Sequence, residues 1–155
     1  MSHSTDVTVR PITAADEARW RELYRGYREF YKLAADEAVV STVWGWLMDP
    51  AHVCEALVAE HAGRVVGLAN HRWMPRPSTG DEGLWLDDLF TDPEVRGRGV
   101  GRALIAGLVE IAAARPGASV SWITAADNHQ AQALYNKVAY RTHWVTYDTD
   151  PADAA

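Results

Sequence analysis

The sequence lacks the features of an exported or membrane-bound chain. Its 155 residues include one cysteine, Cys54, which excludes an internal disulfide and fits a reducing compartment. No apolar run is long enough to span a bilayer, and residues 1–6 are polar where a secretory signal would be apolar. We therefore expect a cytoplasmic protein that does not use a membrane.

Excess positive charge is also lacking. The net charge of −6 at pH 7 argues against a general nucleic-acid binder and is compatible with a cationic substrate. The six histidines show no metal-ligand spacing, so we expect no metal site. With 48% hydrophobic and 23% charged residues, the composition predicts a single domain over residues 1–155, with a frayed tail over residues 148–155.

A glycine- and arginine-rich segment lies between an apolar run and a helical pattern. It consists of Arg96, Gly97, Arg98, Gly99, Val100, Gly101 and Arg102. Glycine lets the backbone approach a ligand closely, and free N–H groups at a helix start favour an anion. A Walker A loop would require Lys-Ser or Lys-Thr after Gly101, and the dinucleotide fingerprint would place its third glycine one residue later. The segment suits a pyrophosphate, although a glycine-rich turn with a solvated basic face has the same composition.

The rest of the pattern predicts an alternation of strands and helices. We expect strands at 7–10, 55–61, 64–73, 84–91, 118–125 and 141–147. We expect helices from residue 13 or 16 to about 31, and at 36–48, 99–114 and 128–138, with a loop at 74–83.

Two segments carry recognisable motifs. Residues 96–101 read Arg-x-x-Gly-x-Gly, and residues 128–140 read Asn-His-Gln-Ala-Gln-Ala-Leu-Tyr-Asn-Lys-Val-Ala-Tyr. Together they resemble the acyl-CoA motif and the C-terminal motif of the GNAT superfamily of N-acetyltransferases, with a departure at Ala139, where the family usually has glycine. The sequence around both motifs is similar to that of the fungal histone/polyamine and D-amino-acid acetyltransferase branch. The resemblance implies an α/β fold whose central mixed sheet has splayed middle strands and is flanked by about four helices.

The same resemblance implies acetyl-CoA as the cofactor and direct transfer of its acetyl group to a primary amine. Pantetheine would pair with the end of the strand at 84–91, and the diphosphate would bind the glycine-rich segment. The cofactor-binding residues expected in this way are Leu89, Phe90, Thr91, Arg96, Gly97, Arg98, Gly99, Val100, Gly101, Arg102, Asn128 and Tyr135.

The transfer needs a group that takes a proton from the amine and a group that gives one to the leaving thiolate. Tyr135 matches the family's general acid, and Asp87 matches one of the positions of its general base. Asp88 would anchor a cationic amine. Neighbouring strand residues point to opposite faces unless a bulge intervenes, so a solvated acidic pair is the alternative for Asp87 and Asp88.

In this fold the first two helices border the acceptor site. The first helix carries an aromatic run at helical spacing that ends at Tyr31, and Glu29 lies beside it, so both are candidate substrate-binding residues. The acceptor is expected to be a polyamine, diamine, amino acid or lysine-like amine.

Two other functions remain open. One is protein N-terminal acetylation, although the glutamate typical of that group is replaced by Ile123. The other is a non-catalytic acyl-CoA sensor, against which Tyr135 and Asp87 argue. By resemblance, a homodimer would form through the last strand, with Trp144 and Tyr147 as contact residues.

Overall fold

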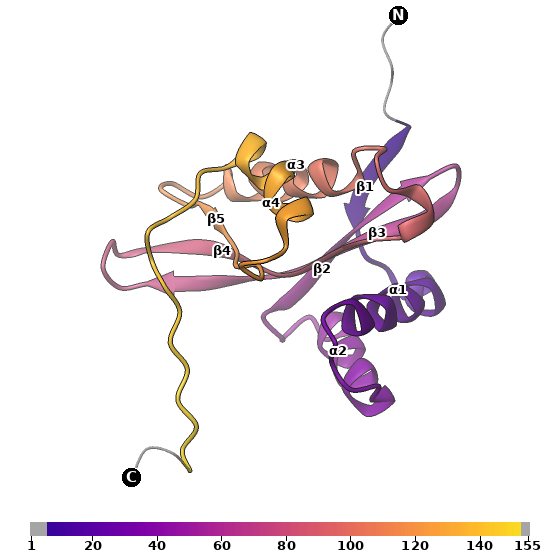
Figure 1. Ribbon diagram of the computed structural model, residues 1–155, viewed down its shortest axis with the longest axis horizontal. Helices are drawn as coiled ribbons and strands as arrows, with labels where there is room; N and C mark the ends of the chain where they lie inside the picture. The colour runs from indigo at the N-terminus through magenta and orange to yellow at the C-terminus, as the bar shows by residue number, and fades with distance from the viewer. Residues whose placement is uncertain (1–5, 153–155) are drawn as a thin grey trace, which may run out of the picture. The chain divides into compact units, whose positions relative to one another are not determined.

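The computed structural model describes residues 6–152 and divides the chain into two compact units, with the boundary in the sequence between Ile123 and Thr124. The first unit contains β1 (Val7–Pro11), η1 (Ala14–Asp16), α1 (Glu17–Phe30), α2 (Glu37–Met48), β2 (Cys54–His61), β3 (Arg64–Arg76), β4 (Asp81–Thr91), η2 (Pro93–Val95), α3 (Val100–Ala112) and β5 (Val120–Ser121). The second unit contains α4 (His129–Val138) (Figure 1). No helix among the described residues is both long and apolar enough to cross a bilayer.

The first unit is built on a mixed five-stranded sheet in the order β1-β2-β3-β4-β5. The first three pairings are antiparallel, whereas β5 runs parallel to β4. This parallel pairing is limited to Leu84 with Val120 and Trp85 with Ser121, so the rest of β4 continues without β5 beside it. The mixed α/β sheet and the splaying of its strands are confirmed.

The helices of this unit cover both faces of the sheet: α1 and α2 lie on one face and α3 lies on the other (Figure 1). On the first face, Trp20 of α1 and Trp44 of α2 are buried in one apolar cluster with Val58, Leu68 and Phe90. On the opposite face α3 approaches β3 closely at Gly67. A Cβ atom at this position would lie 2.6 Å from Cγ1 of Val100, so only glycine accommodates this helix.

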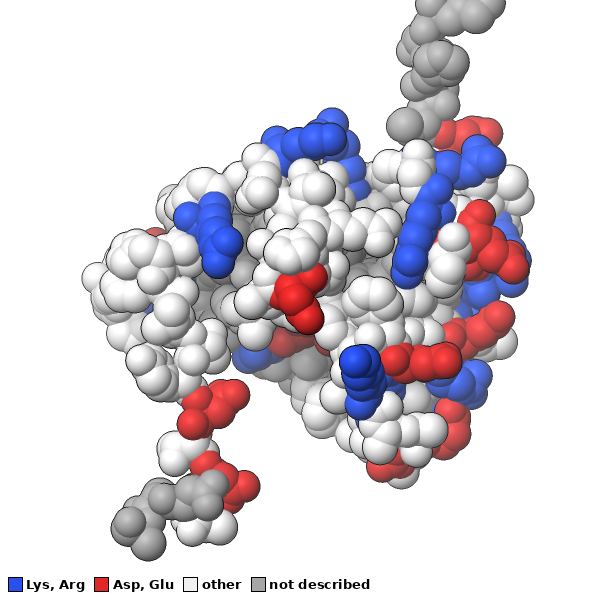
Figure 2. Space-filling view, in the orientation of Figure 1, with Lys and Arg blue, Asp and Glu red and all other residues white. Residues whose placement is uncertain are grey.

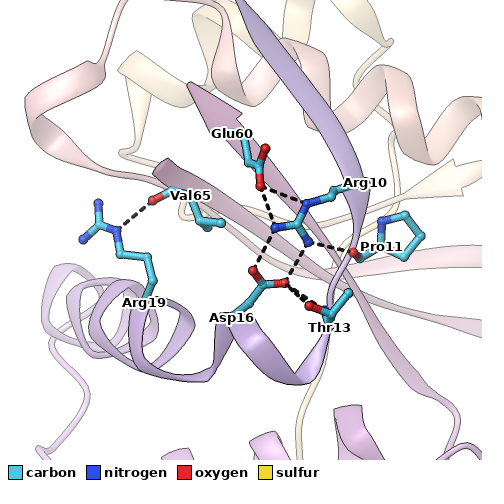
Figure 3. A network of polar contacts seen from close by, with 7 residues as sticks. All are labelled: Arg10, Pro11, Thr13, Asp16, Arg19, Glu60 and Val65. Atoms are coloured by element: carbon cyan, nitrogen blue, oxygen red, sulfur yellow. Dashed lines mark hydrogen bonds and ion pairs between the residues drawn. The ribbon is translucent and has the colours of Figure 1, made fainter. Parts of the chain in front are cut away.

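A partly buried ionic network sets the entry into α1 (Figure 3). Both guanidinium nitrogens Nη1 and Nη2 of Arg10 donate to the Asp16 carboxylate at 2.8 Å, and Nη2 also donates to Glu60 at 2.7 Å. The backbone N–H of Thr13 donates to Asp16 at 2.8 Å. The hydrogen bonds from Arg10 hold the pKa of Asp16 below its usual value. The helix therefore starts where the sequence predicts it, and this network also joins β1 to β2.

The second helix begins as predicted, since the Asp36 carboxylate accepts from the backbone N–H of Ala38 at 3.0 Å and so caps α2. The outer surfaces of α1 and α2 carry paired charges, such as Arg25 with Glu37. Acidic and basic side chains lie side by side over this part of the face in Figure 2.

The prediction of a loop at residues 74–83 is wrong. Instead β3 and β4 extend into a longer hairpin in which Met74 pairs with Gly83 and Arg76 pairs with Asp81. The Nε atom of Arg76 donates to Asp81 at 2.7 Å, and Gly80 supplies a positive φ of 68° for the turn. Two prolines indicated a loop, but a proline can occupy an edge or bulge position of a hairpin without breaking it.

The predicted strand at residues 118–125 is reduced to Val120–Ser121, and the strand predicted at 141–147 does not form. The side chains of Tyr140, Trp144, Val145 and Tyr147 are between 74% and 89% exposed. A strand needs a neighbour for its backbone hydrogen bonds and for burial of one face. No strand pairs with this segment among residues 6–152, so its apolar alternation is not sufficient.

Candidate active site

The acidic pair lies at a β-bulge in β4. On β3, Asn70 is opposite Asp88 and His71 is opposite Leu86, so Asp87 is the extra residue. A bulge changes the alternation of side-chain directions and is frequent next to active sites. The irregularity that the sequence required for Asp87 and Asp88 to act together is therefore present. Burial, followed by the charge of Asp88, raises the pKa of Tyr24, and Asp87 adds to this effect.

A buried network fixes the carboxylate of Asp88. Its Oδ2 accepts from Nδ2 of Asn70 at 2.9 Å and from the hydroxyl of Tyr24 at 3.2 Å. In turn, Oδ1 of Asn70 accepts from the indole N–H of Trp20 at 3.3 Å. Trp20 is fully buried and Asn70 is 4% exposed. The hydrogen bonds between Trp20, Asn70 and Asp88 are therefore shielded from solvent and keep the carboxylate in one orientation.

Asp87 has a different partner and a different character. The Nε atom of Arg72 on β3 lies 3.1 Å from both of its carboxylate oxygens. Burial nevertheless raises the pKa of Asp87, because desolvation outweighs the attraction of Arg72. A carboxylate with a raised pKa is a stronger base than a free one, which suits proton abstraction near neutral pH.

The first helix contributes phenols that act as donors. Burial, followed by the charge of Asp88, raises the pKa of both Tyr24 and Tyr27, so both stay protonated at neutral pH. Their rings stack with centroids 5.6 Å apart, and the Tyr27 and Tyr31 rings are 4.8 Å apart. Tyr31 is thus connected to Asp88 through the rings of Tyr27 and Tyr24, and its role in substrate binding stays a prediction.

The glycine-rich segment fits an anion. Gly97 and Gly99 have φ values of 82° and 77°, a region that favours glycine. Gly99 is the N-cap of α3 and offers no side-chain acceptor to the first N–H groups of the helix. These groups and the exposed Arg98 and Arg102 suit a diphosphate. The buried Val100 anchors the helix start against the sheet.

The residues at the end of β4 differ in how deeply they are buried. The Phe90 side chain is buried in the core beneath α1, whereas Leu89 and Thr91 are half-buried. Because β5 pairs with β4 only up to Trp85, this stretch has no strand on its β5 side within the described part of the unit. Pairing of pantetheine with this edge stays a prediction.

A pocket of about 380 Å³ lies between α1 and the segment that follows β4. Its lining includes Glu29 and Phe30 of α1 together with Phe90, Asp92 and Arg96. The guanidinium of Arg96 lies 5.8 Å from the centre of the Phe30 ring. The structure therefore brings Glu29 to the glycine-rich segment, whereas the acidic pair does not line this pocket.

The second unit carries the C-terminal motif. Asn128 caps α4, with Oδ1 accepting from the backbone N–H of Ala131 at 3.3 Å. Tyr135 is a half-buried residue of the same helix, and the roles of Asn128 and Tyr135 stay predictions. Ala139 ends the helix with an extended φ of −150°, which any residue adopts, so this chain does not need the family's glycine there.

Sequence reasoning missed two partners of the acidic pair, Asn70 and Arg72. Asn70 had a detectable signal, because it is a polar residue at the end of the apolar run Val-Val-Gly-Leu-Ala. Arg72 had none, because its partner depends on the bulged register between β3 and β4.

Known proteins are similar to this chain in sequence and in fold. Residues 18–140 match the acetyltransferase (GNAT) family. The D-amino-acid N-acetyltransferase HPA3 of Saccharomyces cerevisiae is 31% identical over 143 residues, covering 91% of this chain and 89% of that protein. The structure of a ribosomal-protein-alanine N-acetyltransferase from Brucella melitensis has a TM-score of 0.75 at 23% identity, covering 93% and 98% of the two chains. The aminoglycoside N-acetyltransferase AAC(6')-Iy in complex with CoA has a TM-score of 0.76 at 19% identity, covering 94% and 95%. The chain therefore belongs to the acetyltransferase (GNAT) family and is an acyl-CoA-dependent N-acetyltransferase.

Proposed function

We propose that this enzyme acetylates the primary amine of a small molecule, with amino acids as the first class to consider. The observation that carries the proposal is the pair of carboxylates at the β4 bulge. Asp88 is held rigidly by Tyr24 and Asn70, and Asp87 has a raised pKa. The similarity to a D-amino-acid N-acetyltransferase supports the amino-acid class.

Each carboxylate has its own task in this proposal. Asp88 binds the protonated amine, because a carboxylate that hydrogen bonds hold in one orientation pairs with a cation without reorganising. Asp87 takes the proton that the amine must lose, through a water molecule, before the nitrogen can attack. Tyr135 gives a proton to the sulfur that leaves. A phenol, with an ordinary pKa of about 10, still carries that proton at neutral pH.

Acetyl-CoA supplies the acetyl thioester. The backbone N–H groups of the segment from Arg96 to Arg102 hold its diphosphate, and the half-buried end of β4, at Leu89 and Thr91, offers backbone groups to its pantetheine. Asn128 contributes a side-chain amide in addition to its capping role.

The direct test is release of CoA thiol in the presence of acetyl-CoA and a panel of amines. The panel contains amino acids of both hands, diamines, polyamines, aminoglycosides and a peptide with a free N-terminus. We expect turnover of a small amine that falls at least 100-fold in Asp87→Asn and Tyr135→Phe, with acetyl-CoA affinity retained. Turnover of the peptide alone would favour a protein N-acetyltransferase. Tight acetyl-CoA binding without any turnover would favour a sensor.

Three further expectations, on domain organisation, location and oligomeric state, belong to the same proposal. The chain acts as one domain in the cytoplasm, and two copies pair through the C-terminal segment. The exposed Trp144 and Tyr147 support such pairing, since large apolar side chains gain by burial against a partner. Light scattering of the protein and of Trp144→Ala tests the dimer, which the substitution should weaken.

A further inference from the structure

Among the buried side-chain nitrogen and oxygen atoms of residues 6–152, one has no hydrogen-bond partner, and it is Nε of Arg28. Arg28 lies on α1, one helical turn after Tyr24, so the two side chains project from the same side of the helix. A buried donor without an acceptor is costly in a folded protein, and such a group in a native structure calls for a reason.

The Arg28 side chain is nevertheless held in place. Its Nη2 donates to the backbone oxygen of Ala34 at 2.9 Å, in the connection between α1 and α2. Its own backbone oxygen accepts from the N–H of Leu33 at 2.9 Å, which closes the end of α1 around Lys32, a residue with a φ of 57°. The guanidinium is therefore tethered at one nitrogen while Nε stays available.

Tyr24 links the side of α1 that carries Arg28 to the acidic pair. Burial, followed by the charge of Asp88, raises the pKa of Tyr24, whereas the charge of Arg28 lowers it. The hydroxyl of Tyr24 also donates directly to Asp88 at 3.2 Å. One hydroxyl is thus within electrostatic reach of a guanidinium and of two carboxylates. A ligand at this hydroxyl would meet a positive and a negative group together.

We infer that Arg28 binds the carboxylate of an α-amino acid acceptor whose amine binds at Asp88. This inference rests on the proposed function and specifies its acceptor. A guanidinium pairs with a carboxylate through charge-assisted hydrogen bonds, and the acceptor would satisfy Nε, which lacks a partner. A polyamine would leave Nε unsatisfied and would place a second cation next to Arg28. The role of Arg28 is thus to determine specificity.

The test compares three amines that differ in the carboxylate: alanine of either hand, alaninamide and ethylamine. The variants are Arg28→Gln and Arg28→Lys, with Arg25→Gln as the matched control, since Arg25 pairs with Glu37 on the exposed side. For Arg28→Gln we expect the KM for alanine to rise about 10- to 100-fold, with kcat and the KM for alaninamide nearly unchanged. Arg28→Lys should recover part of the loss, and Arg25→Gln should behave as the wild type.

A purely structural role for Arg28 would produce a different pattern. Arg28→Gln would then raise the KM for alanine and alaninamide equally, or lower kcat for both, and either result would overturn the inference. Wild-type enzyme that uses ethylamine as well as alanine would also overturn it and leave the proposed function intact. If the wild type binds acetyl-CoA but acetylates no amine, the proposed function fails and takes this inference with it. Thermal melting of each variant in the presence of acetyl-CoA shows whether the fold is retained.

Discussion

Replacing Gly67 by alanine tests how α3 is seated on the sheet. The added Cβ would lie 2.6 Å from Cγ1 of Val100, 3.1 Å from Cδ1 of Leu104 and 3.2 Å from the backbone oxygen of Phe90. The carbonyl belongs to the sheet and cannot move easily, so the start of α3 must shift. To restore ordinary contact, Val100 has to move by roughly 0.8 Å.

The expected cost follows from this geometry. Overpacking a buried site by one methyl group typically destabilises a protein by about 1–3 kcal/mol. For a chain of this length, a loss of about 2 kcal/mol lowers the melting temperature by roughly 4–8 °C. Val100 follows Gly99 directly, so the displacement also moves the N–H groups that are expected to bind the diphosphate. We expect the KM for acetyl-CoA to rise on the order of 10-fold.

Differential scanning fluorimetry and initial-rate kinetics measure both effects. Gly45→Ala is the matched control, because no atom lies within 4 Å of a Cβ at that position inside α2. Alanine in a helix interior is favoured over glycine by about 0.5–1 kcal/mol, so Gly45→Ala should raise the melting temperature. Equal melting temperatures and equal KM values for Gly67→Ala and the wild type would refute the reasoning.

The remaining predictions concern charge. Asp16→Asn should destabilise the protein at neutral pH. Because folding lowers the pKa of Asp16, its contribution to stability is present above about pH 4 and is lost as the pH falls through the pKa of the folded state. Denaturant melts of the variant and the wild type should therefore converge in acid. The value of kcat/KM should fall in acid as Asp87, with its raised pKa, takes up a proton. Arg72→Gln should move this acidic limb of the pH profile to higher pH, because Arg72 lowers the pKa of Asp87. A limb that does not move would argue against Asp87 as the base. Asn70→Ala should raise the KM for the amine about 10-fold without changing the KM for acetyl-CoA, because it frees Asp88 to rotate; an equal rise in both would indicate a general loss of structure.

The acidic pair shows where sequence reasoning stops. Two adjacent carboxylates in an apolar strand predict a functional site, and the need for a bulge follows from strand geometry alone. The bulge is present between Asn70 and His71 on the partner strand. The identity of the hydrogen-bond partners does not follow, because a change of register by one residue exchanges the faces of a strand.

Local chemistry determined much of this protein from its sequence. Helix caps, glycine positions and apolar periodicity act within a few residues, so they predicted the starts of α1 and α2, the hairpin of β2 with β3 and the glycine-rich entry to α3. The tertiary structure decided the extent of the β3–β4 hairpin, the short β5 and the unpaired segment after α4, because strand length depends on a neighbour that supplies hydrogen bonds. It also decided that Asn70 and Tyr24 hold Asp88, since these contacts join residues that only long-range pairing brings together.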